Sequence, residues 1–216
     1  MEIKNSYVYR GIRKAILQSM FPWDAIRFCV FLIFTILPLC SFFFAPASDQ
    51  TEDAVLTALI VTIIFGFLLA IQTIALAKAV DIMRSPEKST AATRYANILS
   101  FENLCMYVES QCAQPLSDMG HWGVKALADF IIYEHYGDFS VIPYCAIQTI
   151  QPGEIWQKQY GVSHFQNYSV VIEDIYSHSY TIICESTSKR EEMFYNLDEA
   201  LQKARKRWKQ QIENGV

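Results

Sequence analysis

Two long uncharged stretches separated by a short acidic linker occupy the N-terminal half of this 216-residue chain. The first runs from residue 28 to residue 48, and the second from residue 54 to residue 77. A helix needs about 20 apolar residues to cross a bilayer, and in lipid its backbone polar groups must be satisfied within the segment. We therefore predict a transmembrane hairpin over residues 28–83, with residues 49–53 as its turn.

Basic residues flank this hairpin and are absent from its turn. Five precede the first stretch and four follow the second, whereas the turn carries only Asp49, Glu52 and Asp53. Cytoplasmic loops carry an excess of Lys and Arg. The pattern predicts a multi-pass membrane protein with both termini in the cytoplasm.

A cleaved signal peptide is the competing interpretation of the first stretch. Ala45-Pro46-Ala47 matches a small-x-small cleavage site. However, the basic region before the stretch and the apolar run itself are both longer than in an ordinary signal peptide. The sequence therefore favours a spanning helix.

Residues 1–27 are expected to form a basic cytoplasmic segment. Within it, residues 7–20 have the pattern of a short amphipathic helix, with Val8 and Ile12 among its apolar residues and Arg10 and Lys14 among its basic ones. Such a helix can lie on the inner leaflet, where basic residues meet anionic lipid. The alternative is a positive flank that only sets the topology.

Residues 84–216 have the length of one ordinary domain, and Pro86 lies in the polar connector that begins it. The formal net charge of −4 argues against a general nucleic-acid binder. None of the six cysteines belongs to a CxxC pair, and no phosphate-binding, dinucleotide-binding or metalloprotease motif is present. We expect no cofactor, no metal and no enzymatic activity.

Alternation of apolar and polar residues predicts strands in the second half of the chain. The expected strands lie at residues 129–136, within residues 139–150, and at residues 168–174 and 180–185. Residues 151–164 have the composition of a loop, and residues 95–109 fit either strands or a helix. A closing helix is predicted over residues 197–213, with Asn196 as its N-cap.

The order of strand, "IPYCAIQTI" segment, hairpin and single C-terminal helix resembles the YcxB-like bacterial pleckstrin-homology-like (PH-like) membrane proteins. The matching residues are Ile142, Pro143, Tyr144, Ile147 and Ile150, and the resemblance extends over residues 130–212. It implies two transmembrane helices in a bacterial inner membrane and an antiparallel β domain capped by its last helix. The resulting fold class is a membrane-anchored α+β protein, and the family implies no catalytic residues.

Two sets of residues are candidates for a chemical site. One pairs the thiol of Cys105 or Cys112 with the imidazole of His121 or His135. The other is a group of carboxylates that could act together or hold a divalent cation: Asp118, Asp129, Glu134 and Asp138. Nothing in the spacing supports either set, so we interpret these residues as structural or surface residues.

Two surfaces are candidates for binding. A basic cluster on the closing helix can meet anionic lipid or remain a solvated face: Lys203, Arg205, Lys206, Arg207 and Lys209. The aromatic-rich segment 156–168 can present rings to a protein partner, or its rings can close one end of the domain.

These features lead to three hypotheses about function. The first is a bacterial inner-membrane protein whose PH-like domain binds a protein partner without catalysis, for example as an immunity protein against a delivered toxin. The second is a structural subunit of a membrane secretion or transport complex. The third, a membrane-tethered enzyme, is the least supported, because no activated nucleophile can be identified.

Overall fold

The computed structural model describes residues 3–19, 21–44, 52–113, 115–119, 123–135, 137–159 and 162–213. The chain forms two compact units, one of residues 16–86 and the other of residues 1–15 together with residues 87–216. The boundary after residue 86 falls inside the polar connector. The small-x-small segment at residues 45–47 lies outside the described residues. Most of the predicted turn lies outside them as well.

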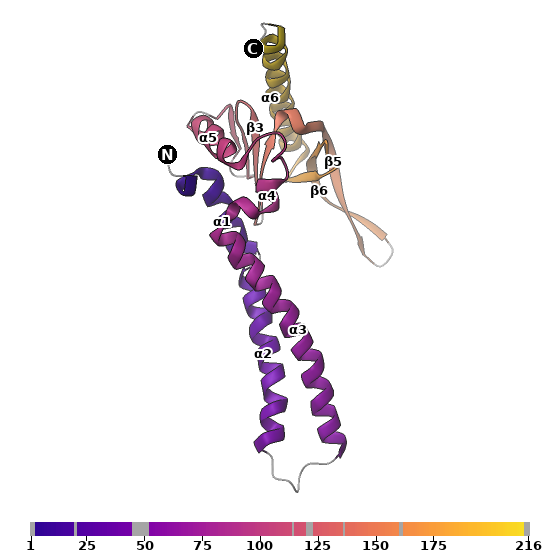
Figure 1. The fold of residues 1–216 in the computed structure, drawn as a ribbon. Helices are drawn as coiled ribbons and strands as arrows, with labels where there is room; N and C mark the ends of the chain where they lie inside the picture. Colours follow the sequence, from indigo (N-terminus) through magenta and orange to yellow (C-terminus); the bar gives the residue numbers. More distant parts are fainter. Residues whose placement is uncertain are drawn as a thin grey trace. The chain divides into compact units, whose positions relative to one another are not determined.

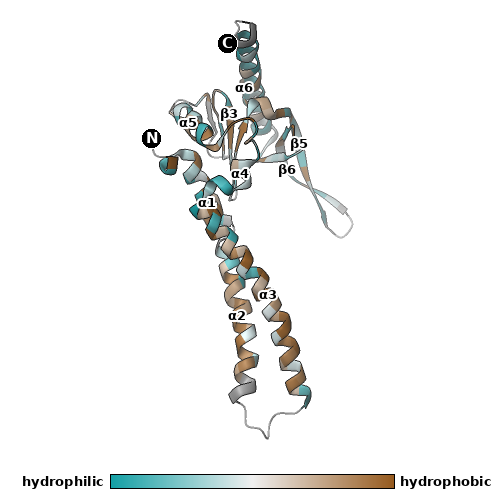
Figure 2. Cartoon of the chain, viewed as in Figure 1, coloured by the Kyte–Doolittle hydropathy of each residue, from teal (hydrophilic) through white to brown (hydrophobic). Residues whose placement is uncertain are grey.

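Helices α2 (Phe21–Phe44) and α3 (Glu52–Arg84) are the main elements of the first unit. The structure has two helices that are long and apolar enough to cross a membrane, and hydrophobic residues cover most of α2 and α3 (Figure 2). Large apolar side chains on both are exposed, including Leu37 and Phe67. Since water is a poor environment for so much apolar surface, this exposure supports the predicted pair of membrane-spanning helices.

Aromatic contacts and hydrogen bonds join α2 to α3. The ring of Phe34 stacks on that of Phe65 with the centroids 4.9 Å apart. Gln72 Nε2 donates a hydrogen bond to Asp24 Oδ1 at 2.8 Å. Pairing this amide with a carboxyl group satisfies polar atoms that would otherwise be costly to bury.

The described residues of the second unit include all or part of four α-helices. They are α1 (Tyr7–Ser19), α4 (Thr90–Thr93), α5 (Phe101–Cys112) and α6 (Thr187–Glu213). Short 3-10 turns cover Ile3–Asn5, Pro86–Lys88 and Tyr144–Ala146. Helix α5 contains residues 101–109 of the segment that fits either strands or a helix, whereas residues 95–99 form turns and a bend. Ser100 caps the helix by accepting a hydrogen bond from the amide of Asn103.

In the part of the chain that the structure describes, seven antiparallel strands form two sheets (Figure 1). The four-stranded sheet follows the order β1 (Ser117–Met119), β2 (Val124–Ala126), β3 (Phe130–His135) and β4 (Asp138–Pro143). The three-stranded sheet follows the order β5 (Ile147–Gln159), β6 (Val162–Asp174) and β7 (Ser179–Cys184). With the helices, these sheets give the mixed helix and antiparallel-sheet class that the sequence predicts.

The expected loop over residues 151–164 is wrong, because most of it belongs to β5 and β6. Twelve register pairs join the two strands, from Ile147 opposite Asp174 to Gln159 opposite Val162. The outer part of this hairpin extends away from the other strands of the unit (Figure 1). Most of the described side chains in this outer part are exposed. The sequence there does not need the alternation of apolar and polar residues that identifies a half-buried strand.

The closing helix begins ten residues earlier than predicted, so Asn196 is an interior residue and not the N-cap. Ser186 provides the cap, since its Oγ accepts a hydrogen bond from the amide of Lys189 at 3.3 Å. The buried stripe starts at Met193 and continues through Leu197 to Ala204. The additional turns therefore extend the apolar face that packs on the sheets.

Helix α1 packs on the β domain through its apolar face. Contact of its basic residues with the inner leaflet stays a prediction. Its apolar side chains Val8 and Ile12 are buried, and Lys14 forms a 2.5 Å ion pair with Glu134 of β3. Gly11 lies against the ring of Phe139 so closely that a Cβ would stand 2.2 Å from it. The first turns of α1 are thus part of the domain.

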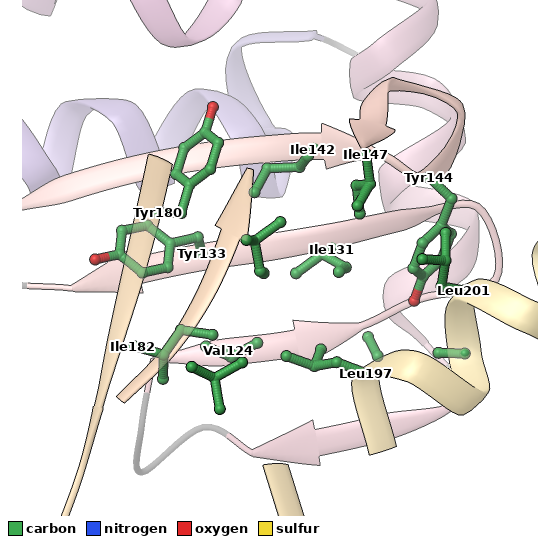
Figure 3. Packing of buried hydrophobic residues seen from close by; sticks show 14 of the residues in the cluster. Val124, Ile131, Tyr133, Ile142, Tyr144, Ile147, Tyr180, Ile182, Leu197 and Leu201 are labelled. Atoms are coloured by element: carbon green, nitrogen blue, oxygen red, sulfur yellow. The ribbon is translucent and has the colours of Figure 1, made fainter. Parts of the chain in front are cut away.

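The core of the second unit lies between the two sheets and α6 (Figure 3). Ile142, Tyr144 and Ile147, which carry the family resemblance, are buried in it, and Ile150 is partly buried against it. Leu197 and Leu201 of α6 complete the same cluster. The motif therefore contributes to packing.

Candidate protein-binding surface

The exposed aromatic cluster lies on the outer part of the β5–β6 hairpin. The register places Trp156 of β5 opposite Phe165 of β6, and their rings meet edge to face with centroids 5.6 Å apart. Phe165 also contacts Tyr168, at 4.8 Å between centroids. Of the two outermost rings, Trp156 is 56% exposed and Phe165 44% exposed. We call Trp156, Phe165 and Tyr168 the hairpin aromatic cluster.

Neighbouring residues hold this cluster in place. Trp156 Nε1 donates a hydrogen bond to Glu154 Oε2 at 3.1 Å. At the inner end, the guanidinium carbon of Arg190 on α6 lies 5.2 Å from the centroid of the Tyr168 ring. A cation over an aromatic face is attractive, so this contact ties the base of the hairpin to the helix.

This geometry selects between the two interpretations of the aromatic segment. Rings that closed one end of the domain would be buried, yet Trp156 and Phe165 are among the exposed large hydrophobic residues. Aromatic residues are enriched in protein interfaces because they bury a large area at little entropic cost. The hairpin aromatic cluster is therefore the candidate protein-binding surface.

The basic cluster on α6 is divided between structural and exposed residues. The guanidinium of Arg207 donates to the carbonyl oxygen of Ala128 and lies 3.5 Å from Asp129 Oδ1, so Arg207 fastens α6 to the segment before β3. Lys203 Nζ forms a 2.8 Å ion pair with Glu199. Lys203 is exposed, as are Arg205, Lys206 and Lys209. Contact of the basic cluster with lipid stays a prediction.

A buried polar network that sequence reasoning missed centres on Asp174, which is fully buried at the end of β6. Its Oδ2 accepts a hydrogen bond from the Tyr95 hydroxyl at 2.7 Å, and its Oδ1 accepts from the amides of Tyr176 and His178 at 2.9 and 2.8 Å. The Tyr95 and Tyr180 hydroxyls are 2.9 Å apart. Burial raises the pKa of Tyr95 far above its usual value, so the network holds the β6–β7 turn without offering a proton at neutral pH.

Two of the candidate chemical groups, Asp129 and Glu134, make contacts that join elements of the fold. Burial raises the pKa of the thiols of Cys105, Cys145 and Cys184, which disfavours the nucleophilic thiolate. Asp129 bonds to Gln111 through its Oδ2 at 2.7 Å. His121 lies outside the described residues.

No metal centre is formed by the described part of the chain, where no three His, Cys, Asp or Glu side chains come together. Glu134, one of the four carboxylates considered for such a centre, forms an ion pair with Lys14 of α1. Its carboxylate Oε2 also lies 3.5 Å from the hydroxyl of Tyr7, which donates to it. Glu134 therefore serves the packing of α1 on β3.

Comparisons with known proteins return no match from family models, from curated proteins or from solved structures.

Proposed function

We propose that this chain is a bacterial inner-membrane protein that binds a protein partner through a PH-like cytoplasmic domain and catalyses no reaction. The exposed hairpin aromatic cluster is the observation that carries this proposal. Solvent-exposed rings in mutual contact on a projecting hairpin match the aromatic anchors that contribute most of the binding energy at many interfaces. In the part of the chain that the structure describes, Trp156 remains 56% exposed and Phe165 44% exposed.

The fold supports the PH-like part of the proposal. Seven antiparallel strands are followed by a single long helix, α6, and this is the order that the family resemblance implies. Helices α4 and α5 lie before the first described strand, β1.

The location in the membrane rests on two arguments. Helices α2 and α3 are long and apolar enough to span a bilayer, and the basic residues flank the hairpin while its turn is acidic. The positive-inside rule then favours a cytoplasmic domain. A role as an immunity protein and a role as a subunit of a secretion or transport complex both require this protein-binding surface, and they differ in the partner.

Photocrosslinking from within the native membrane tests the proposed surface. A benzophenone amino acid would replace Phe165 in the full-length protein, and the same probe would replace Met106 of α5 as a control, because Met106 is also an exposed apolar residue at 51%. We expect from position 165 one adduct whose mass differs from that of two crosslinked copies of this chain, and we expect no adduct from position 106.

A second variant separates recognition from chance proximity. Trp156→Ala removes the ring opposite Phe165, so the adduct from position 165 should fall at least tenfold, which corresponds to about 1.4 kcal/mol of binding free energy. Equal adducts from positions 165 and 106, or no adduct from position 165, would refute the assignment of the surface.

A further inference from the structure

Strand β5 has one unpaired edge along its outer half. In the three-stranded sheet it pairs with β6 alone, and β7 pairs only with residues 168–173 of β6. Within the described residues, the outer hairpin is therefore a two-stranded ribbon. An isolated two-stranded ribbon is marginally stable in water, and an open edge presents unpaired N–H and C=O groups to another strand.

Pro152 shows which backbone groups face this edge. A proline has no N–H to donate, so it is tolerated in a sheet where its nitrogen points away from the neighbouring strand. Pro152 pairs with Val170 of β6, which turns its nitrogen towards the open edge. Because backbone direction alternates along a strand, the N–H and C=O groups of Glu154, Trp156 and Lys158 point towards the open edge as well.

The side chains along this edge are complementary to the same side chains on a second, antiparallel copy of the strand. Glu154, Trp156 and Lys158 alternate along β5 and so share one face, and the hydrogen bond from Trp156 to Glu154 agrees with that placement. A β-bulge lies beside Trp156. Ile155 pairs with Asn167 and Trp156 pairs with Phe165, so the extra residue belongs to β6. The alternation of side chains along β5 is therefore continuous.

We propose that the open edge of β5 pairs with the same edge of a second copy of this chain, antiparallel and about a two-fold axis at Trp156. In this register Glu154 lies opposite the partner's Lys158, and Lys158 lies opposite the partner's Glu154. The two Trp156 rings meet at the axis, and the two sheets join into one of six strands. A two-fold axis makes the contact between Glu154 and the partner's Lys158 occur twice.

The charge pattern favours a second copy over an unrelated strand. Between Pro152 and the end of β5, Glu154 and Lys158 are the only charged residues, both are exposed, and they are equidistant from Trp156. Opposite charges directly across an antiparallel pair are favourable and like charges are unfavourable. The symmetric spacing matches one register of self-pairing. The inference goes beyond the proposed function and does not rest on it, since it concerns the edge of β5 and a copy of this chain.

Charge exchange at the two positions tests the register. The full-length protein in detergent would be studied by light scattering coupled to size-exclusion chromatography over a concentration series, with no partner present. We expect a dimer for the unchanged chain. Glu154→Lys and Lys158→Glu should each weaken it at least tenfold, because like charges then face each other twice.

Two combinations make the test specific. The double variant Glu154→Lys/Lys158→Glu should recover the dimer, since the pair is only reversed. The two single variants, carrying different tags and mixed, should associate with each other more tightly than with themselves. Gln148→Lys, an exposed residue of β5 before Pro152, serves as the control and should leave the dimer unchanged.

Three results would each overturn the pairing. They are a monomeric unchanged chain at all concentrations, a dimer that the single variants do not weaken, and a mixture of single variants that associates no better than either alone. A failed dimer would leave the crosslinking test of the protein partner unaffected, because the dimer is measured with this chain alone.

Discussion

Replacing Asp174 with alanine is expected to destabilise the domain by about 3–5 kcal/mol. The change leaves the Tyr95 hydroxyl and the amides of Tyr176 and His178 without the carboxyl group that accepts their hydrogen bonds. Buried donors that lose their acceptor cost more than the bond itself contributes. The effect is concentrated at the β6–β7 turn, where Ser177 adopts a positive φ of 60°.

The loss is measured on the full-length protein in detergent, by pulse proteolysis of the domain across a urea series. Glu192→Ala on α6 is the control, since Glu192 is exposed, and it should change the free energy of unfolding by less than about 0.5 kcal/mol. A cost below about 1 kcal/mol for Asp174→Ala would show that the network is not needed to hold the turn.

Ile147→Ala is expected to cost about 2–5 kcal/mol of folding free energy. Ile147 is 4% exposed and belongs to the core cluster that also contains Tyr144 and Leu197. Truncating it removes buried methyl and methylene groups and leaves a cavity that the surrounding sheets fill only partly.

The neighbouring residue provides a matched control on the same strand. Gln148 is exposed, so Gln148→Ala should have little effect in the same proteolysis measurement. If Ile147→Ala cost less than roughly 0.5 kcal/mol, the packing role assigned to the IPYCAIQTI segment would be wrong.

The sequence predicts those parts of the fold where burial or lipid exposure imposes a pattern. The two apolar stretches correspond to α2 and α3, and the β6–β7 hairpin follows from alternation along residues 168–174 and 180–185. The first added turn of α6 follows from the same pattern, because Met193 stands one turn before Leu197 and extends the apolar stripe. The start of the helix at Thr187 does not follow from it.

The sequence shows which residues form the candidate site, but it does not show that they lie on a β-hairpin. The rings of residues 156–168 are evident in the sequence, whereas Pro152, Gly153 and the many polar residues give the outer hairpin the composition of a loop. The Asp174 network and the packing of α1 on Glu134 join residues more than 75 positions apart. Neither local propensity nor periodicity indicates which distant residues come into contact.

The most direct test of binding without catalysis compares two kinds of variant in the native membrane. One is the double variant Trp156→Ala/Phe165→Ala. The other is a set of single replacements of Cys105, Cys112, Cys145 and Cys184 by Ser or Ala. The quantity measured is the amount of partner complex recovered per folded, membrane-inserted protein, together with the biological activity that depends on it.

We predict that every cysteine variant keeps the complex and the activity, because burial raises the pKa of three of the four thiols and none has the environment of an activated nucleophile. The double aromatic variant should lose at least nine-tenths of the complex, since about 1.4 kcal/mol of lost binding free energy suffices for a tenfold change. The opposite result, a folded cysteine variant without activity beside an aromatic variant with full binding, would contradict the proposed function.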